Sequence, residues 1–272
     1  MINPGDDVIV PAPSYPAHVY AVALASGNPI AIDTTKPDRF LSEISARCES
    51  AAGPPKVLVV NFPHNPTTTV VEKDFYEDAI TAFLEEDKLD FPKEIEVLFT
   101  GSSSIRFWNS LEDDMQPLKV LNRGFGGAHI AHVNHHFEDV IQRYSPKAIV
   151  FFCGTNDLTA LKTPEETIQD FEILKDKVHQ ALPGVHLFVI GIKPSPARVY
   201  LEKEEIAYNM MIDEIASKDD LVTFIDIWDA MLSAEGERIP DLFVEDGLHM
   251  NAKGYEIWTK LVREHLKTMF TL

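Results

Sequence analysis

A chain of 272 residues is long enough to bury one sizeable core, or one domain with an appendage. Acidic residues outnumber basic ones by 43 to 24, and the resulting net charge of −19 repels nucleic acid and anionic membranes. No apolar run approaches the roughly 18 residues that a membrane-spanning helix needs. The opening residues, MINPGDDVIV, lack the basic region and long apolar stretch of a secretory signal, so we expect a cytoplasmic protein.

The first part of the chain alternates short apolar runs with helical stretches. We expect strands over 7–15, 29–33 and 56–62, and helices near 17–26 and 38–50. This part is far richer in proline than the rest, with the stretches PAPSYP, GPP and NFPHNP. The shift in composition predicts a boundary near residue 75, which divides the chain into domains 1–75 and 76–272. A predicted helix over 72–92 joins them.

From residue 95 onward the pattern is regular. Apolar runs rich in β-branched residues occupy 95–101, 118–124, 147–154, 186–192 and 221–228. Amphipathic stretches over 129–144, 164–181, 200–218 and 251–268 alternate with them. Short apolar strands that alternate with helices predict an α/β fold, a doubly wound parallel sheet covered by helices on both faces in three layers. Ligands of such sheets bind at the carboxyl ends of the strands.

Three serines follow the first of these strands, in the stretch GSSSIRFW (101–108). Gly101 allows the chain to turn sharply and to approach a neighbouring backbone closely. One interpretation is an ordinary strand-to-helix turn in which a serine caps the helix. The other is a nucleophilic serine, held where backbone N–H groups stabilise an oxyanion.

Two further strands end in polar turns. NRGFGG (122–127) exposes glycine N–H groups that suit an anion, although a tight turn explains it equally. GTND (154–157) brings Asn156 to a strand end, where its amide can donate to an oxyanion, although Asn-Asp is also ordinary turn chemistry. The last helix opens with VEDGLHMNAKG (244–254), in which Asp246 and His249 stand three residues apart. This loop could supply a general base and the carboxylate that orients it, or it could be a surface loop.

The joint occurrence of these four blocks, each after a strand, resembles the SGNH (GDSL-type) hydrolase family over roughly residues 80–272. That resemblance implies the flavodoxin-like form of the doubly wound sheet. It aligns Ser103 with the family's nucleophile and Trp108 with the tryptophan that follows it. The family's aspartate before the nucleophile is replaced here by Ser102, which leaves a non-catalytic relative as an alternative.

The resemblance also implies the remaining roles. Asp246 and His249 complete a triad with Ser103, and the oxyanion hole consists of the Ser103 N–H, the Gly127 N–H and the Asn156 amide. His249 takes the Ser103 proton, Ser103 attacks an ester carbonyl, an acyl-enzyme forms, and water releases the acid. We therefore expect a serine esterase for small acyl esters, acetyl or short-chain, that acts on a small-molecule substrate without a cofactor.

Other residues suggest weaker hypotheses. The two cysteines cannot build a disulfide framework, and Cys153 lies in an apolar run as a buried thiol. We expect no metal site, because no carboxylate or cysteine completes a ligand set around the four neighbouring histidines. The stretch KPSPAR (193–198) either lines the acyl or alcohol pocket or is a proline-stiffened loop. The two cysteines are Cys48 and Cys153, and the four histidines are His129, His132, His135 and His136.

Residues 1–75 resemble a different family. NPGDDVIVPAPSYP and KVLVVNFPHNPTTTVVE are similar to the large domain of fold-type I pyridoxal-phosphate aminotransferases, in which Asn65 would contact the cofactor ring. No later segment resembles that family's cofactor-lysine region, and without the lysine no Schiff base forms. We expect a non-catalytic appendage that packs on the hydrolase or joins two copies in a homo-oligomer. The alternative is a non-hydrolytic protein that uses this segment to bind a phosphate cofactor or a partner.

Overall fold

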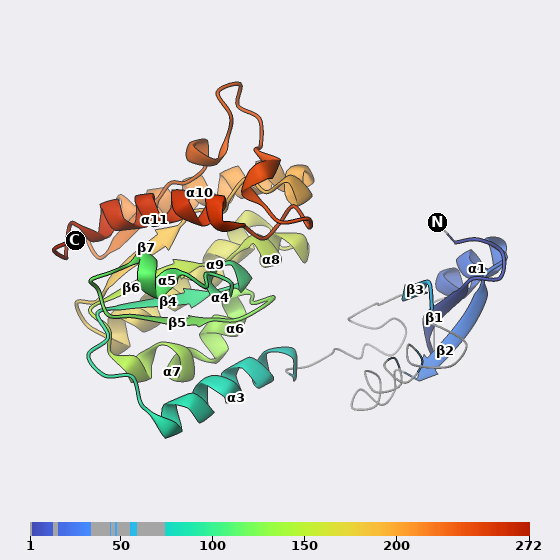
Figure 1. Cartoon of the computed structure of the whole chain (residues 1–272), viewed down its shortest axis with the longest axis horizontal. Helices are drawn as coiled ribbons and strands as arrows, with labels where there is room; N and C mark the ends of the chain where they lie inside the picture. The colour runs from blue at the N-terminus through green and yellow to red at the C-terminus, as the bar shows by residue number, and fades with distance from the viewer. Residues whose placement is uncertain (1, 13–15, 34–43, 45–46, 48–54, 59–73) are drawn as a thin grey trace. The chain divides into compact units, whose positions relative to one another are not determined.

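The computed structural model describes residues 2–12, 16–33, 44, 47, 55–58 and 74–272 (Figure 1). The chain divides into two compact units, Met1–Phe75 and Tyr76–Leu272. The predicted helix over 38–50 falls almost wholly outside the described residues, and so do Cys48 and Asn65. In the described part of the chain, no helix combines the length and the apolar character needed to span a membrane.

The first unit holds a small parallel sheet. Strands β1 (Asp7–Ala12), β2 (Asn28–Asp33) and β3 (Val57–Leu58) pair in the order β2-β1-β3, and helix α1 (Pro16–Leu24) connects the first two. Val8, Val10 and Val22 are buried in one small apolar cluster, and Ile9 and Ile32 in another. Alternate residues of β1 therefore face opposite sides, as the period of a strand requires.

The second unit is built on a five-stranded sheet whose strand pairs are all parallel. Its strands are β4 (Val97–Gly101), β5 (Val120–Gly124), β6 (Ala148–Phe152), β7 (His186–Ile190) and β8 (Val222–Ile225), in the order β5-β4-β6-β7-β8. All five lie within the predicted apolar runs. The order of the first three reverses direction between β4 and β6, which is the topological switch point where doubly wound sheets bind ligands. The predicted fold class is confirmed.

Helices cover both faces of this sheet. Within β4, Val97 and Phe99 belong to one core cluster and Leu98 to the other, so successive residues fill opposite cores. Helices α3, α6 and α7 lie on one side of the sheet and α11 on the other (Figure 1). The helices are α3 (Asp74–Leu89), α4 (Ser103–Arg106), α5 (Leu111–Asp114), α6 (Ile130–His135), α7 (Phe137–Val140), α8 (Thr155–Thr159), α9 (Pro164–Ala181), α10 (Glu202–Ala216) and α11 (Ala252–Leu266), with 3-10 turns η1 (Gln142–Tyr144), η2 (Pro196–Leu201), η3 (Asp229–Met231) and η4 (Pro240–Leu242).

One predicted helix differs from the structure. The stretch over 129–144 forms three short pieces, α6, α7 and η1, rather than one helix. The backbone departs from helical angles at His136 and Ile141. The buried apolar residues of the three pieces keep the spacing of one helical stripe in the same core, so the pattern predicts a single helix and does not reveal the two breaks.

Helix α3 belongs physically to the second unit. Ile80 is buried in the core, and the fully buried Asp87 accepts a hydrogen bond from Arg123 Nη2 at 2.7 Å. The Tyr144 hydroxyl donates to the other oxygen of the same carboxylate at 2.7 Å, and Arg123 Nε donates to that hydroxyl at 2.8 Å. Burial raises the pKa of Tyr144 to about 12, so the hydroxyl keeps its proton. This polar triangle attaches α3 to β5.

Candidate active site

The carboxyl ends of the three strands around the switch point are in register. Gly101 pairs with Gly124 on one side and with Phe152 on the other. Gly101 has a φ of +127°, and a Cβ atom there would lie 2.0 Å from the Phe152 carbonyl oxygen. Only glycine fits this approach, which lets the Ser102 N–H donate to the same carbonyl at 2.9 Å. The three polar turns that follow these strands are thereby brought to one edge of the sheet.

The three serines after Gly101 have different environments. Ser102 is buried and occupies the N-cap position of α4, but its side chain makes no capping hydrogen bond. Ser104 is also buried, and its carbonyl accepts a hydrogen bond from the Tyr255 hydroxyl at 2.9 Å. Ser103, between them, is the partly exposed one. The turn therefore presents one hydroxyl and holds its neighbours inside the protein.

Ser103 meets the loop that precedes α11. His249 Nε2 lies 2.9 Å from Ser103 Oγ, and His249 Nδ1 lies 2.5 Å from Asp246 Oδ2. With the imidazole proton on Nδ1, the ring donates to the carboxylate and accepts from the serine hydroxyl. The structure thus brings three predicted site residues, which span almost 150 positions of sequence, into one hydrogen-bonded chain.

The Asp246 loop is shaped by its own backbone contacts. Asp246 Oδ1 accepts hydrogen bonds from the N–H groups of Leu248 at 2.8 Å and His249 at 2.9 Å. Burial acts to raise the pKa of Asp246, but the hydrogen bonds from the His249 ring and from these two N–H groups outweigh it and lower that pKa. The Phe107 ring packs edge-on against the imidazole, with centroids 5.0 Å apart. The carboxylate is therefore kept ionised beside a ring of fixed orientation.

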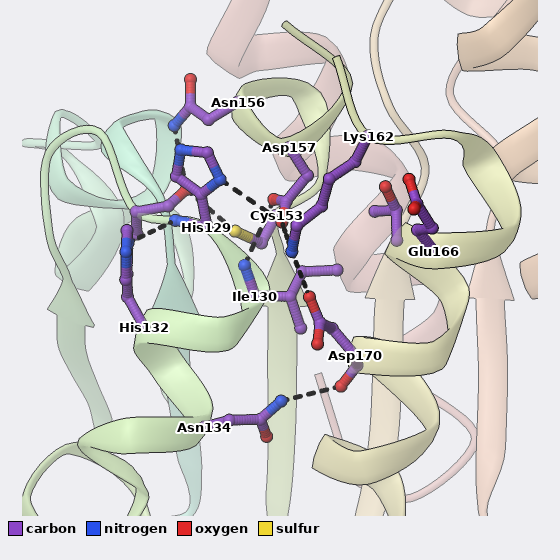
Figure 2. Close-up of polar contacts among 12 residues, drawn as sticks. His129, Ile130, His132, Asn134, Cys153, Asn156, Asp157, Lys162, Glu166 and Asp170 are labelled. Carbon is purple, nitrogen blue, oxygen red and sulfur yellow. Dashed lines mark hydrogen bonds and ion pairs between the residues drawn. The ribbon is translucent and has the colours of Figure 1, made fainter. Parts of the chain in front are cut away.

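Gly127 and Asn156 follow β5 and β6, the two strands that flank β4 on opposite sides. Gly127 has a positive φ of 66° in the turn that leads to α6. Asn156 Nδ2 donates to the Ala128 carbonyl at 2.9 Å, which ties the amide to that turn (Figure 2). An amide nitrogen carries two protons, so this bond orients Nδ2 and leaves it a second proton to donate.

The buried carboxylate of Asp157 stabilises the turn that leads to α6. Asp157 is fully buried, accepts from the Ile130 N–H at 3.2 Å, and lies 3.3 Å from Lys162 Nζ and 3.5 Å from His129 Nδ1 (Figure 2). Burial lowers the pKa of His132 to about 4, so its ring is neutral and accepts a hydrogen bond from the His129 N–H. The sequence predicted Asp157 only as a turn residue, because nothing in GTND shows that its carboxylate is buried.

Two other contacts could not be predicted from the sequence, because they join segments that are distant along the chain. The Asn122 side chain donates to the Ile105 carbonyl at 2.7 Å and accepts from the Gly124 N–H at 2.9 Å, which joins the end of β5 to α4. In the KPSPAR stretch, the Ala197 N–H donates to the Gly247 carbonyl at 3.0 Å. That segment therefore supports the loop that carries Asp246.

No metal site emerges at the histidines that the sequence singled out. Across the described residues, no group of three or more His, Cys, Asp or Glu side chains is arranged to hold a metal ion. Cys153 is a buried free thiol whose Sγ contacts the Ala128 carbonyl at 3.2 Å, and burial raises its pKa well above the ordinary value. A protonated, buried thiol is unreactive.

The family model for the GDSL-like lipase/acylhydrolase family matches residues 99–257, more than half of the chain. The chain belongs to this family. It is accordingly a carboxylic ester hydrolase by class. The sheet and its helices are similar to those of a GDSL-like lipase from Bacteroides thetaiotaomicron, with a TM-score of 0.61, 18% identity, and coverage of 70% of this chain and 98% of that one. A carbohydrate esterase family 3 protein from Talaromyces cellulolyticus gives a TM-score of 0.51, 17% identity, and coverage of 64% and 97%.

The first part of this hydrolase matches another family model, that of class I and II aminotransferases, over residues 1–89. LL-diaminopimelate aminotransferase from Halothermothrix orenii is 38% identical over 79 residues, which is 29% of this chain and 20% of that protein. The chain thus spans about a fifth of the length of this curated relative. The match extends into α3, although Ile80 and Asp87 of that helix are buried in the second unit.

Proposed function

We propose that this hydrolase is a serine esterase in which Ser103 is the nucleophile, His249 the general base and Asp246 the carboxylate that orients it. One observation carries the proposal, the unbroken hydrogen-bonded chain from Ser103 Oγ through the imidazole to the Asp246 carboxylate. A neutral imidazole that accepts the serine O–H is ready to take its proton. The ionised carboxylate then stabilises the imidazolium that forms.

The reaction would proceed in two halves. Ser103 Oγ attacks the ester carbonyl as its proton passes to His249 Nε2, and the tetrahedral intermediate expels the alcohol, which takes that proton. Water then gives a proton to the same nitrogen and attacks the acyl-serine, and Ser103 recovers its proton as the acid leaves.

The oxyanion of both intermediates would accept hydrogen bonds from the Ser103 N–H, the Gly127 N–H and the Asn156 amide. The register of the three strand ends supports this arrangement, since each donor follows a strand at the switch point. The bond from Asn156 Nδ2 to the Ala128 carbonyl supports it as well, because a donor that is already oriented stabilises charge without reorganisation.

We propose small acyl esters, acetyl or short-chain, as the substrate class. The fold similarity to a carbohydrate esterase makes acetylated carbohydrate a candidate alcohol part. The alternative, a non-hydrolytic protein that binds a phosphate cofactor or partner through residues 1–75, has no specific observation in its favour.

The test is turnover of p-nitrophenyl acetate, together with labelling by a fluorophosphonate probe that reacts with activated serines. Ser103→Ala should lose on the order of a million-fold in kcat and all labelling. Ser102→Ala is the matched control from the same turn, and it should keep labelling at Ser103. Loss of labelling in Ser102→Ala, with survival in Ser103→Ala, would refute the assignment of the nucleophile.

A further inference from the structure

Lys193 is a buried cation at the turn that carries Ser103. It begins the KPSPAR stretch after β7, and only 2% of its surface is exposed. Its Nζ donates to Ser104 Oγ at 2.9 Å and lies 4.8 Å from the centroid of the Phe152 ring. Ser104 is the residue after Ser103, and its carbonyl is held by Tyr255. Remote segments therefore hold both the side chain and the backbone of the residue next to the nucleophile.

This buried charge is costly to the fold. Taking an ammonium out of water is strongly unfavourable unless a carboxylate pairs with it closely. Glu205 and Asp246 attract the Lys193 ammonium, but their own ion pairs are with Arg238 and His249. Lys193 instead bonds a neutral hydroxyl and faces an aromatic ring. A chain of methylene groups without charge would fill the same space at lower cost, so stability does not explain the lysine.

We propose that Lys193 is a positioning residue of the esterase, whose ammonium holds Ser104 and thereby fixes the turn that presents Ser103 Oγ to His249. The inference rests on the function proposed above. A hydrogen bond from an ammonium is roughly twice as strong as one between neutral groups, so the charge itself matters for this contact. A small displacement of a nucleophile is enough to reduce turnover strongly.

The positioning should fade when Lys193 loses its proton. Burial, with a smaller contribution from Arg198 on η2, lowers the pKa of Lys193 to about 8 against the opposing attraction of Glu205 on α10 and Asp246 in the triad loop. The ammonium therefore predominates below about pH 8, and the neutral amine predominates above it. The remaining contacts, Ser104 on α4 and Phe152 on β6, carry no charge. Turnover should accordingly decline as the pH rises through 8.

The experiment compares the wild type with Lys193→Met, Lys193→Arg and Lys147→Met between pH 6 and 10. The readouts are kcat/KM on p-nitrophenyl acetate and the rate of fluorophosphonate labelling at Ser103. Lys147 pairs with Glu96 near the amino end of β6 and is exposed, so Lys147→Met is the matched control. We expect a wild-type decline above about pH 8 that Lys147→Met repeats. Lys193→Met should be slower by on the order of 100-fold at pH 7, without that decline.

Lys193→Arg keeps its charge across this range, so it should retain labelling at pH 9 to 10 where the wild type loses it. An active wild type, together with a Lys193→Met variant of equal rate and equal alkaline decline, overturns the positioning role and leaves the proposed function intact. A Lys193→Met chain that fails to fold, beside a Lys193→Arg chain that keeps the decline, overturns it too, since Lys193 is then a packing residue. A wild type with neither turnover nor labelling overturns both proposals.

Discussion

Replacing Asp87 by asparagine tests whether α3 is an integral part of the hydrolase, although the aminotransferase match extends over it. The substitution keeps the shape of the side chain and removes its charge. Asp87 is fully buried in ion pairs with Arg123 at 2.7 Å and Arg143 at 3.5 Å, and it accepts the Tyr144 hydroxyl at 2.7 Å. The side chain of Arg123 is itself only 6% exposed, so it cannot turn to water when its partner is neutralised.

The expected loss follows from that burial. Neutralising one partner of a buried ion pair costs about 3–5 kcal/mol, because the other charge stays buried and, for Arg123, only the longer pairing with the exposed Glu86 remains. In a domain of this size each kcal/mol lowers Tm by about 2–4 °C, so Asp87→Asn should lower Tm by roughly 6–20 °C. Glu86→Gln is the matched control, since Glu86 pairs with the same Arg123 at 3.6 Å from a side chain that is 67% exposed. An exposed pair contributes about 0–1 kcal/mol, so the control should melt close to the wild type.

Thermal melting and urea denaturation of the full chain, both followed by circular dichroism, measure the two losses. The midpoint of the urea transition gives the free energy of unfolding at constant temperature, provided that the slope is unchanged. Equal and small losses in Asp87→Asn and Glu86→Gln would refute the reasoning. In that case the polar triangle would contribute little to the attachment of α3 to β5.

Three further outcomes are expected. Asn156→Ala should lower kcat about 100- to 1,000-fold in steady-state assays with little change in KM, whereas a change in KM alone would contradict an oxyanion role. Burial raises the pKa of Glu205 to about 7 from 4.5, so wild-type stability should fall as the pH rises from about 4.5 to 7. Glu205→Gln should not show this fall in stability. The Tm of Glu205→Gln minus the Tm of the wild type should therefore be larger at pH 8 than at pH 5, and an equal difference at both pH values would argue against the burial effect. Deletion of residues 1–75 should leave measurable turnover, and a folded but inactive 1–75 deletion would contradict this by showing that the first unit shapes the site. Deletion of residues 1–89 should abolish folding, because it removes Ile80 and Asp87 from the core.

Much of the fold follows from local patterns. The five strands of the large sheet lie within the apolar runs that the sequence displays, and α9 matches its predicted bounds at Pro164–Ala181. These elements were predictable because a strand buried on both faces is apolar throughout, and an amphipathic helix has a single apolar stripe. The stretch over 129–144 also has the apolar spacing of one helix, and its breaks at His136 and Ile141 could not be predicted because no proline or glycine marks them.

Two features of the site could be predicted from neighbouring residues alone. Gly101 predicted a sharp turn with a close backbone approach, and a Cβ atom there would lie 2.0 Å from a carbonyl oxygen. The three-residue spacing of Asp246 and His249 within one loop predicted a carboxylate that orients the imidazole, and the two side chains are hydrogen-bonded. Such contacts are local, so the backbone near them specifies them. The choice of Ser103 among three serines came from resemblance rather than from any local signal.

Which distant groups meet depends on the folded chain as a whole. Ser103 and His249 are 146 positions apart, Lys193 reaches Ser104 from 89 positions away, and Arg123 meets Asp87 across 36. A strand end sets where its loop begins, but the twist and order of the whole sheet set which loops converge. Burial is likewise a property of the folded chain, and it is burial that lowers the pKa of Lys193, raises that of Cys153 and makes the ion pairs of Asp87 costly to break.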